Sequence, residues 1–135
     1  MLGTFQHSRL RIEVNASTER IRDSLLQSAQ FKQWLWPQQF SDGLPTVLTP
    51  DTTFTVWFGP IAIQHDIDEV SDRHLRLMLS QGIDGYHEWH WGDGWLQACL
   101  EGVSVLPLNV GQTFSLYRLK RFLEADVEAP STNQT

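Results

Sequence analysis

The sequence predicts a single α+β domain in which an antiparallel sheet is closed by a C-terminal helix. Between Thr52 and Val105, short apolar segments alternate with tight turn signals, which is typical of an antiparallel meander. The run Leu108 to Leu123 is the only stretch near the C-terminus that is long and apolar enough for a substantial helix. A chain of 135 residues is long enough for one such core. A sheet closed by one helix is a container-like arrangement, so a small ligand-binding domain is expected.

The N-terminal third predicts a strand followed by two short helices. Thr4 to Val14 alternates apolar and charged residues in its second half, as a half-buried strand does. Ser17 is a suitable N-cap for a first helix, and Ser28 for a second. Pro37 is expected to end the second helix, because the residue before a proline avoids the helical conformation.

The middle of the chain predicts a loop and then the meander. Residues 38–51 contain turn-forming glycine and prolines, with a short strand expected near Thr46 to Leu48. The expected strands after this loop are Thr52 to Phe58, Ile61 to Val70, His74 to Gln81, Tyr86 to Trp91, and Trp95 to Val105.

The closing helix carries two apolar stripes. Asn109 and Gln112 have the spacing of an N-cap and its reciprocal partner, which predicts that the helix begins at Val110. One stripe comprises Val110, Phe114 and Tyr117, and the other Leu116, Leu119 and Leu123. Since the stripes lie on nearly opposite sides, we expect packing on both. Residues 1–125 are expected to form the domain and 126–135 a flexible tail.

Turn chemistry predicts how the strands pair, and a slip of one residue would turn every side chain to the other face. Residues 71–73, 82–85 and 92–94 are interpreted as loops of three, four and three residues, with Gly94 in the left-handed conformation. The resulting row across four strands is His65, Leu79, Glu88 and Ala98.

This register predicts a mainly aliphatic cavity wall with a few polar groups, as small-molecule sites usually have. The expected ligand-binding residues are Ile63, His65, Ile67, Leu77, Leu79, Tyr86, Glu88 and His90 from the strands, with Phe114 and Tyr117 from the helix. Trp89, Trp91 and Trp95 would then form an outward patch. The alternative register buries these tryptophans and exposes Glu88 and His90.

No residue pattern predicts catalysis or a metal site. His87 and His90 are three residues apart in a predicted strand, which sends them to opposite faces. Glu88 and His90 share a face and could act as an acid–base pair, although a satisfied polar pair is the commoner outcome. Cys99 has no base nearby in sequence and is interpreted as a packed or surface thiol. No glycine pattern binds phosphate, and no cofactor is expected.

The composition limits the kinds of partner and the cellular compartment that are expected. The net charge is −6, and the basic end of the last helix, residues 118–121, is the longest basic cluster, so nucleic acid is not an expected partner. A single cysteine suits a reducing compartment. Without a signal-like or membrane-spanning apolar run, a cytoplasmic location is expected.

The order of elements resembles that of the START-like, or SRPBCC, superfamily over about residues 4 to 125. The local resemblance is in residues 14–21 (VNASTERI), in Phe31-Lys-Gln-Trp34 with Pro37, and in residues 100–106 (LEGVSVL). The superfamily includes polyketide cyclase/dehydratase and lipid-transport proteins. The resemblance implies a helix-grip fold, in which a curved sheet wraps around the last helix and leaves a cavity for an apolar ligand. It implies no particular catalytic residues.

The expected function is therefore binding of a small hydrophobic molecule between the last helix and the sheet, more readily without catalysis than with it. One alternative is a cyclase/dehydratase-like enzyme that uses His65, Glu88 or His90 as acid and base. Another is a protein-interaction module, or contact between copies of the chain, through the tryptophan patch.

Overall fold

The computed structural model describes residues 3–35, 39–40 and 43–128. The strands are β1 (Thr4–Glu13), β2 (Gln39–Phe40), β3 (Thr53–Phe58), β4 (Ile61–Val70), β5 (His74–Gln81), β6 (Asp84–Gly92) and β7 (Trp95–Ser104). The helices are α1 (Thr18–Leu26), α2 (Ser28–Trp34) and α3 (Leu108–Glu128). The strands form one antiparallel sheet in the order β1-β7-β6-β5-β4-β3-β2.

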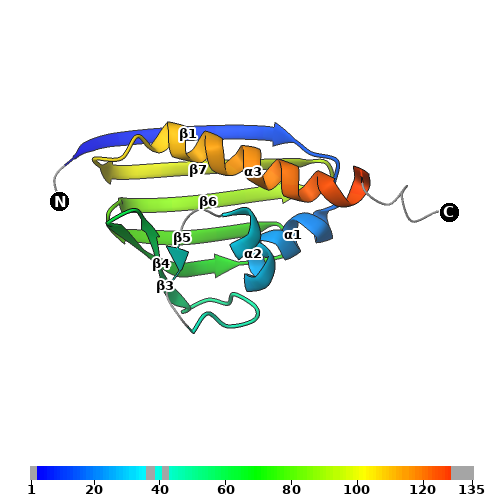
Figure 1. Ribbon diagram of the computed structural model, residues 1–135, viewed down its shortest axis with the longest axis horizontal. Coiled ribbons are helices and arrows are strands. Elements are labelled where there is room, and N and C mark those ends of the chain that lie inside the picture. Colours follow the sequence, from blue (N-terminus) through cyan, green and yellow to red (C-terminus); the bar gives the residue numbers. More distant parts are fainter. Residues whose placement is uncertain (1–2, 36–38, 41–42, 129–135) are drawn as a thin grey trace.

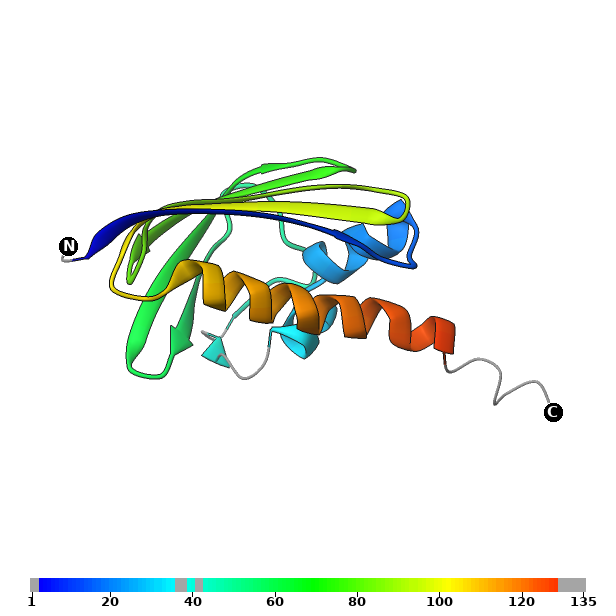
Figure 2. The same ribbon diagram turned by 90° about the horizontal axis from the view of Figure 1, so that it is seen from above.

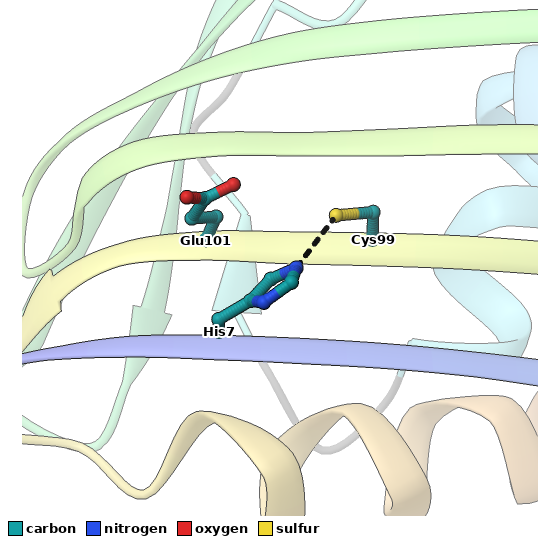
Figure 3. Close-up of side chains that lie close together, drawn as sticks. All are labelled: His7, Cys99 and Glu101. Carbon is teal, nitrogen blue, oxygen red and sulfur yellow. Dashed lines mark hydrogen bonds between the residues drawn. The ribbon is translucent and has the colours of Figure 1, made fainter.

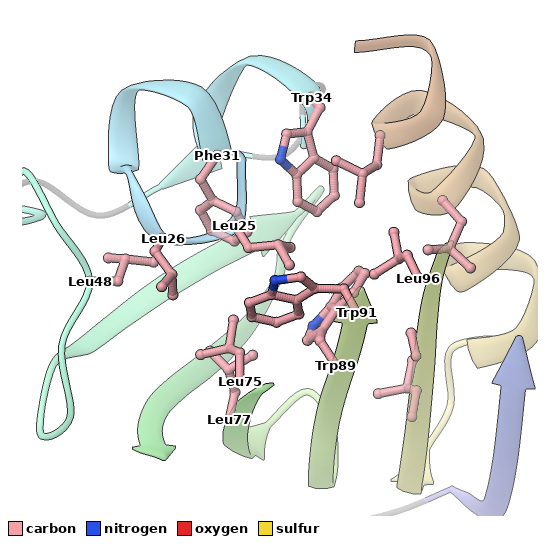
Figure 4. Close-up of a cluster of buried hydrophobic side chains, with 14 of the residues drawn as sticks. Leu25, Leu26, Phe31, Trp34, Leu48, Leu75, Leu77, Trp89, Trp91 and Leu96 are labelled. Carbon is pink, nitrogen blue, oxygen red and sulfur yellow. The ribbon is translucent and has the colours of Figure 1, made fainter. Parts of the chain in front are cut away.

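The predicted helix-grip α+β fold is confirmed. The sheet curves over α3, and α1 and α2 lie on the same side of it (Figures 1 and 2). We call this side the inner face and the opposite side the outer face. Figure 4 shows apolar side chains of both layers meeting on the inner face, among them Leu75, Trp89 and Trp91, which are 1%, 3% and 1% exposed. None of the three described helices is long and apolar enough to cross a membrane.

The start of α1 follows the sequence prediction, and the start of α2 does not. Ser17 caps α1, since its Oγ accepts a hydrogen bond from the Arg20 N–H at 3.1 Å. Ser28 is not an N-cap: it is the first residue of α2, and its N–H and Oγ both donate to the Thr46 carbonyl. The strand expected near Thr46 is reduced to a single bridge between Gln27 and Val47. The helix α2 ends at Trp34, and Pro37 lies outside the described residues.

Trp34 joins the three helices. Its buried indole Nε1 donates to the Ser24 carbonyl of α1 at 2.8 Å, and its ring packs edge-on against Phe31 and Trp89. Its carbonyl accepts a hydrogen bond from Arg118 Nε of α3 at 2.8 Å. These contacts set α2 beside α3 over the middle of the sheet.

The helix α3 begins at Leu108, so the expected start at Val110 is wrong. The Leu108 N–H donates to Gln6 Oε1 of β1 at 2.9 Å. Asn109 and Gln112 do not cap the helix end, because both side chains contact Ser8 of β1: Asn109 Nδ2 donates to Ser8 Oγ at 3.0 Å, and Ser8 Oγ donates to Gln112 Oε1 at 2.5 Å. Two polar residues of β1, Gln6 and Ser8, thus hold the first turn of the helix.

Only one side of α3 is buried. Leu116, Leu119 and Leu123 are at most 2% exposed. The second stripe, Val110, Phe114 and Tyr117, is 64%, 47% and 56% exposed, so the expectation of packing on both sides is wrong. The helix also continues through Glu128, past the expected domain end at residue 125, and residues 129–135 lie outside the described part.

The predicted pairing of β4 with β5 is confirmed for the inner-face residues. His65 lies opposite Leu79, and Ile67 lies opposite Leu77. The connection differs in detail, since a bulge between Ile67 and Glu69 shifts the pairing towards the turn.

The predicted pairing of β6 is wrong on both sides, and the errors turn the whole strand over. Leu79 pairs with Gly85 instead of Glu88, and Glu88 pairs with Cys99 instead of Ala98. Both shifts are odd numbers of residues, so each exchanges the two faces. Trp89 therefore lies on the inner face, and the predicted tryptophan patch does not form.

Two tertiary constraints explain this register. Gly85 belongs to β6 and not to a loop, because it faces Gly102 so closely that a Cβ there would lie 1.9 Å from the Glu101 carbonyl oxygen. At the other end, the turn after Gly92 contains two residues instead of three. Its Asp93 carboxylate accepts hydrogen bonds from Thr18 N and Oγ1 of α1 at 2.7 and 2.8 Å.

The glycine contact predicts a stability difference. Gly85→Ala should lower the free energy of unfolding by about 1–3 kcal/mol, because the new methyl group meets backbone that cannot retreat. Gly111→Ala is the control, since a Cβ there meets nothing within 4 Å and alanine favours a helix by about 0.5–1 kcal/mol. Urea unfolding would measure both, and equal stability of the two variants would contradict the close approach of β6 and β7.

Candidate ligand-binding cavity

A cavity of about 310 Å³ lies between the inner face of β4 to β7 and the helices α2 and α3. Its wall is mainly apolar, with Ile63, Leu77, Leu79 and Leu100 from the strands and Phe31 from α2. Since these elements come from most of the chain, the cavity depends on the complete fold.

Exposed apolar residues mark the mouth of the cavity. Phe58 at the end of β3 and Val110 and Phe114 on α3 all line the cavity, and they are 47%, 64% and 47% exposed. The outward stripe of α3 is therefore partly the rim of the cavity. These residues place apolar surface at the solvent-exposed edge of the cavity.

Four polar side chains interrupt the apolar wall: His65, His87, Gln112 and Ser115. His65 Nδ1 lies 3.1 Å from the Ile63 carbonyl oxygen. Because a carbonyl only accepts, Nδ1 carries the proton and Nε2 remains an acceptor. The ring stacks on Phe54 at 4.9 Å, and burial lowers the pKa of His65 to about 4.

His87 and Gln112 each present a buried polar atom without a partner. Burial, and to a lesser degree the nearby His65, lowers the pKa of His87 to about 3, so its imidazole is neutral at physiological pH. Within the described part of the chain, neither His87 Nε2 nor Gln112 Nε2 has a hydrogen-bond partner. Leaving such atoms unpaired costs about 1–3 kcal/mol each. A bound molecule with a hydrogen-bonding group would recover part of this cost.

The structure brings half of the predicted ligand-binding residues together. Those that line the cavity are Ile63, His65, Leu77, Leu79 and Phe114. Ile67 is 2% exposed in the core and is not a lining residue. Tyr117 is directed away and lines a shallower groove of about 420 Å³ between α2 and α3.

The prediction that Tyr86, Glu88 and His90 face the cavity is wrong, because β6 is inverted. On the outer face, Tyr86 donates to Glu101 Oε2 at 2.5 Å, and this bond raises the pKa of the Tyr86 hydroxyl. Glu88 Oε2 lies 2.7 Å from His74 Nε2, a hydrogen bond that lowers the pKa of Glu88. The Glu88–His90 acid–base pair therefore does not reach the cavity.

Sequence reasoning missed His87 and Gln112. The spacing of Gln112 from Asn109 predicts a capping residue, whereas its hydrogen-bond partner, Ser8, is 104 residues away in the chain. The register predicted from the turns directs His87 to the outer face. The sequence did indicate the observed register of β6, since residues 87, 89 and 91 (His, Trp, Trp) are less polar than residues 86, 88 and 90 (Tyr, Glu, His).

Comparison with known proteins supports the fold. No family model matches the chain, and no curated protein matches it. Among solved structures, CV1439 from Chromobacterium violaceum is 18% identical, with a TM-score of 0.71 over 87% of this chain and 97% of that one. CalU16 from Micromonospora echinospora is 14% identical, with a TM-score of 0.63 over 93% and 86%.

DynU16, a protein of the dynemicin biosynthetic locus, is 19% identical, with a TM-score of 0.66 over 89% of this chain. The present chain spans only 48% of the DynU16 chain. At these identities the similarity shows a shared fold alone.

The two buried histidines predict a pH dependence of stability. The unfolded chain takes up protons below about pH 6.5, whereas folded His65 and His87 stay neutral down to about pH 4 and about pH 3. Stability should therefore fall as pH is lowered through this window, by up to about 1.4 kcal/mol per pH unit for each histidine.

His87→Phe should make this slope shallower, because it removes one of the two groups. Leu79→Met is the control, a change in the same wall that adds no titrating group. Denaturant unfolding at pH 7, 6, 5 and 4 would measure the slopes. The same slope in His87→Phe as in the wild-type protein would contradict a neutral, buried His87.

Proposed function

We propose that this protein binds a small, largely apolar molecule in the cavity between α2, α3 and the inner face of the sheet. The observation that carries the proposal is the combination of an apolar wall with unpaired polar atoms at His87 and Gln112. Buried polar atoms without a partner are uncommon in a packed core, and a ligand can supply the partner where such atoms lie at a cavity wall.

The wall also limits the chemistry of the ligand. At about 310 Å³ the cavity is at the small end of the range for small-molecule sites. Both cavity histidines are neutral, so neither supplies a charge to hold a strong anion. We expect a neutral molecule of one or two rings, or a short branched chain, with a hydroxyl or carbonyl group.

The shared fold supports placing this chain among START-like, or SRPBCC, proteins. Its structural neighbours include a protein of the dynemicin biosynthetic locus, which is compatible with a ligand of natural-product type. The assignment to START-like proteins rests on the order of the elements and on the cavity, and not on sequence identity.

Catalysis of a cyclase or dehydratase kind is the second candidate, and His65 and His87 are the observation that favours it. General acid–base catalysis works best when the pKa of the group lies near the working pH. With pKa values of about 4 and about 3, these imidazoles are weak bases and are almost never protonated at pH 7. Their hydrogen-bonding role is therefore the better supported one.

Filling the cavity should abolish binding. Leu79→Trp places an indole in the cavity, whereas Met78→Trp adds the same group one residue away on the outer face, where Met78 is 39% exposed. With the neutral probe N-phenyl-1-naphthylamine, the wild-type protein and Met78→Trp should both show saturable fluorescence enhancement. Leu79→Trp should bind at least about tenfold more weakly, since the contact area is lost.

Circular dichroism would confirm that both variants are folded. Equal probe binding by a folded Leu79→Trp variant would contradict binding in this cavity. Absence of binding by the wild-type protein to this probe and to a panel of neutral aromatic and aliphatic alcohols would contradict the proposed function itself.

His87 should favour ligands that hydrogen-bond. We expect 2-naphthol to bind about fivefold more tightly than 2-methylnaphthalene, the gain of about one hydrogen bond. His87→Phe should remove this preference, while His90→Phe on the outer face should keep it. Competition against the fluorescent probe would measure both ratios. A preference that survives in His87→Phe would assign the polar contact to another residue.

A further inference from the structure

The outer face carries a second group of side chains, separate from the cavity. His7 of β1 lies directly opposite Glu101 of β7, and Cys99 is two residues from Glu101 on the same side of that strand. Figure 3 shows the three side chains gathered over β1 and β7. Their ligand atoms, a nitrogen, a sulfur and an oxygen, all lie within 4.8 Å of one another.

The distance between nitrogen and sulfur fits a shared metal ion. His7 Nε2 lies 3.7 Å from Cys99 Sγ. Zinc bonds of about 2.3 Å to sulfur and about 2.0–2.1 Å to nitrogen, at a tetrahedral angle, place these two atoms about 3.6 Å apart. A hydrogen bond explains the contact less well, since a thiol is a weak donor and acceptor.

The Glu101 carboxylate is oriented by a hydrogen bond from Tyr86. Tyr86 donates its hydroxyl hydrogen to Glu101 Oε2 at 2.5 Å, which leaves Oε1 for a metal. The Tyr86 oxygen also lies 3.9 Å from Cys99 Sγ, so it borders the same site. Such hydrogen bonds to ligating carboxylates orient them in known metal sites.

We propose that His7, Cys99 and Glu101 bind a divalent transition-metal ion of the zinc type, with water as the fourth ligand. Thiolate and imidazole ligands favour such ions over Mg²⁺ and Ca²⁺. The site lies on the outer face, so a failure to bind metal there would leave the proposed function of the cavity unaffected.

A neighbouring group, His74, Glu88 and His90, fits a metal less well and is the matched control. His74 Nε2 is already at hydrogen-bond distance, 2.7 Å, from Glu88 Oε2, and the two imidazoles stack at 4.5 Å. A tetrahedral metal would need its ligand atoms about 3.4 Å apart, so these side chains would have to separate.

The direct test titrates the reduced, metal-free protein with Co²⁺, whose thiolate complexes absorb strongly in the near ultraviolet. The wild-type protein should bind one Co²⁺ with this absorption, and Zn²⁺ should displace it. Cys99→Ser should lose the absorption, and His7→Gln and Glu101→Gln should weaken binding about tenfold or more. His74→Gln should behave as the wild-type protein does.

A second measurement needs no variant. Because Cys99 is the only cysteine, alkylation by iodoacetamide reports on it alone. Zn²⁺ should slow alkylation of the folded wild-type protein about tenfold or more, since a coordinated thiolate is shielded. No Co²⁺–thiolate absorption in the wild-type protein, unchanged alkylation with Zn²⁺, or loss of metal binding in His74→Gln would each overturn the proposal.

Discussion

The register of β6 is the constraint on which the rest of the structure depends. The turn after Gly92 is held by Asp93, whose carboxylate accepts two hydrogen bonds from Thr18 at the start of α1. Those bonds lower the pKa of Asp93, which keeps its carboxylate charged. With the turn fixed, Trp89 and Trp91 must point inwards, and Glu88 and His90 must point outwards. A short contact between a turn and a helix N-terminus thus decides what each face of the sheet can do.

The inner face shows the consequence for binding. Trp34 and Trp89 pack together where α2 meets the sheet, while the shorter side chains of β4 and β5 leave a space beside them. His87 reaches this space because it lies two residues from Trp89 on the same strand. The polar atoms of the wall are neutral and the apolar rim is exposed, so entry of an uncharged molecule meets no large desolvation barrier.

The sequence was sufficient for the fold and for half of the cavity. Alternating residues and turn signals located every long strand, and the β4–β5 pairing followed because the apolar residues of both strands have to share one face. The β6 register could not be predicted from local turn chemistry, since Asp93 is held by Thr18, 75 residues earlier. The start of α3 failed for the same reason, as Ser8 of β1 takes the side chains of Asn109 and Gln112. Long-range polar contacts overrode locally plausible patterns in both cases.

We propose that an uncharged small molecule occupies the cavity beside Leu79 and His87. The most direct measurement is an NMR experiment that records intermolecular NOEs between 2-naphthol and the methyl groups of the protein. Occupation of this cavity predicts NOEs to methyl groups of Ile63, Leu77 and Leu79 on the inner face. It also predicts none to Met78, which lies on the outer face. NOEs to Met78 alone, or none to the inner-face methyl groups at saturating ligand, would contradict it.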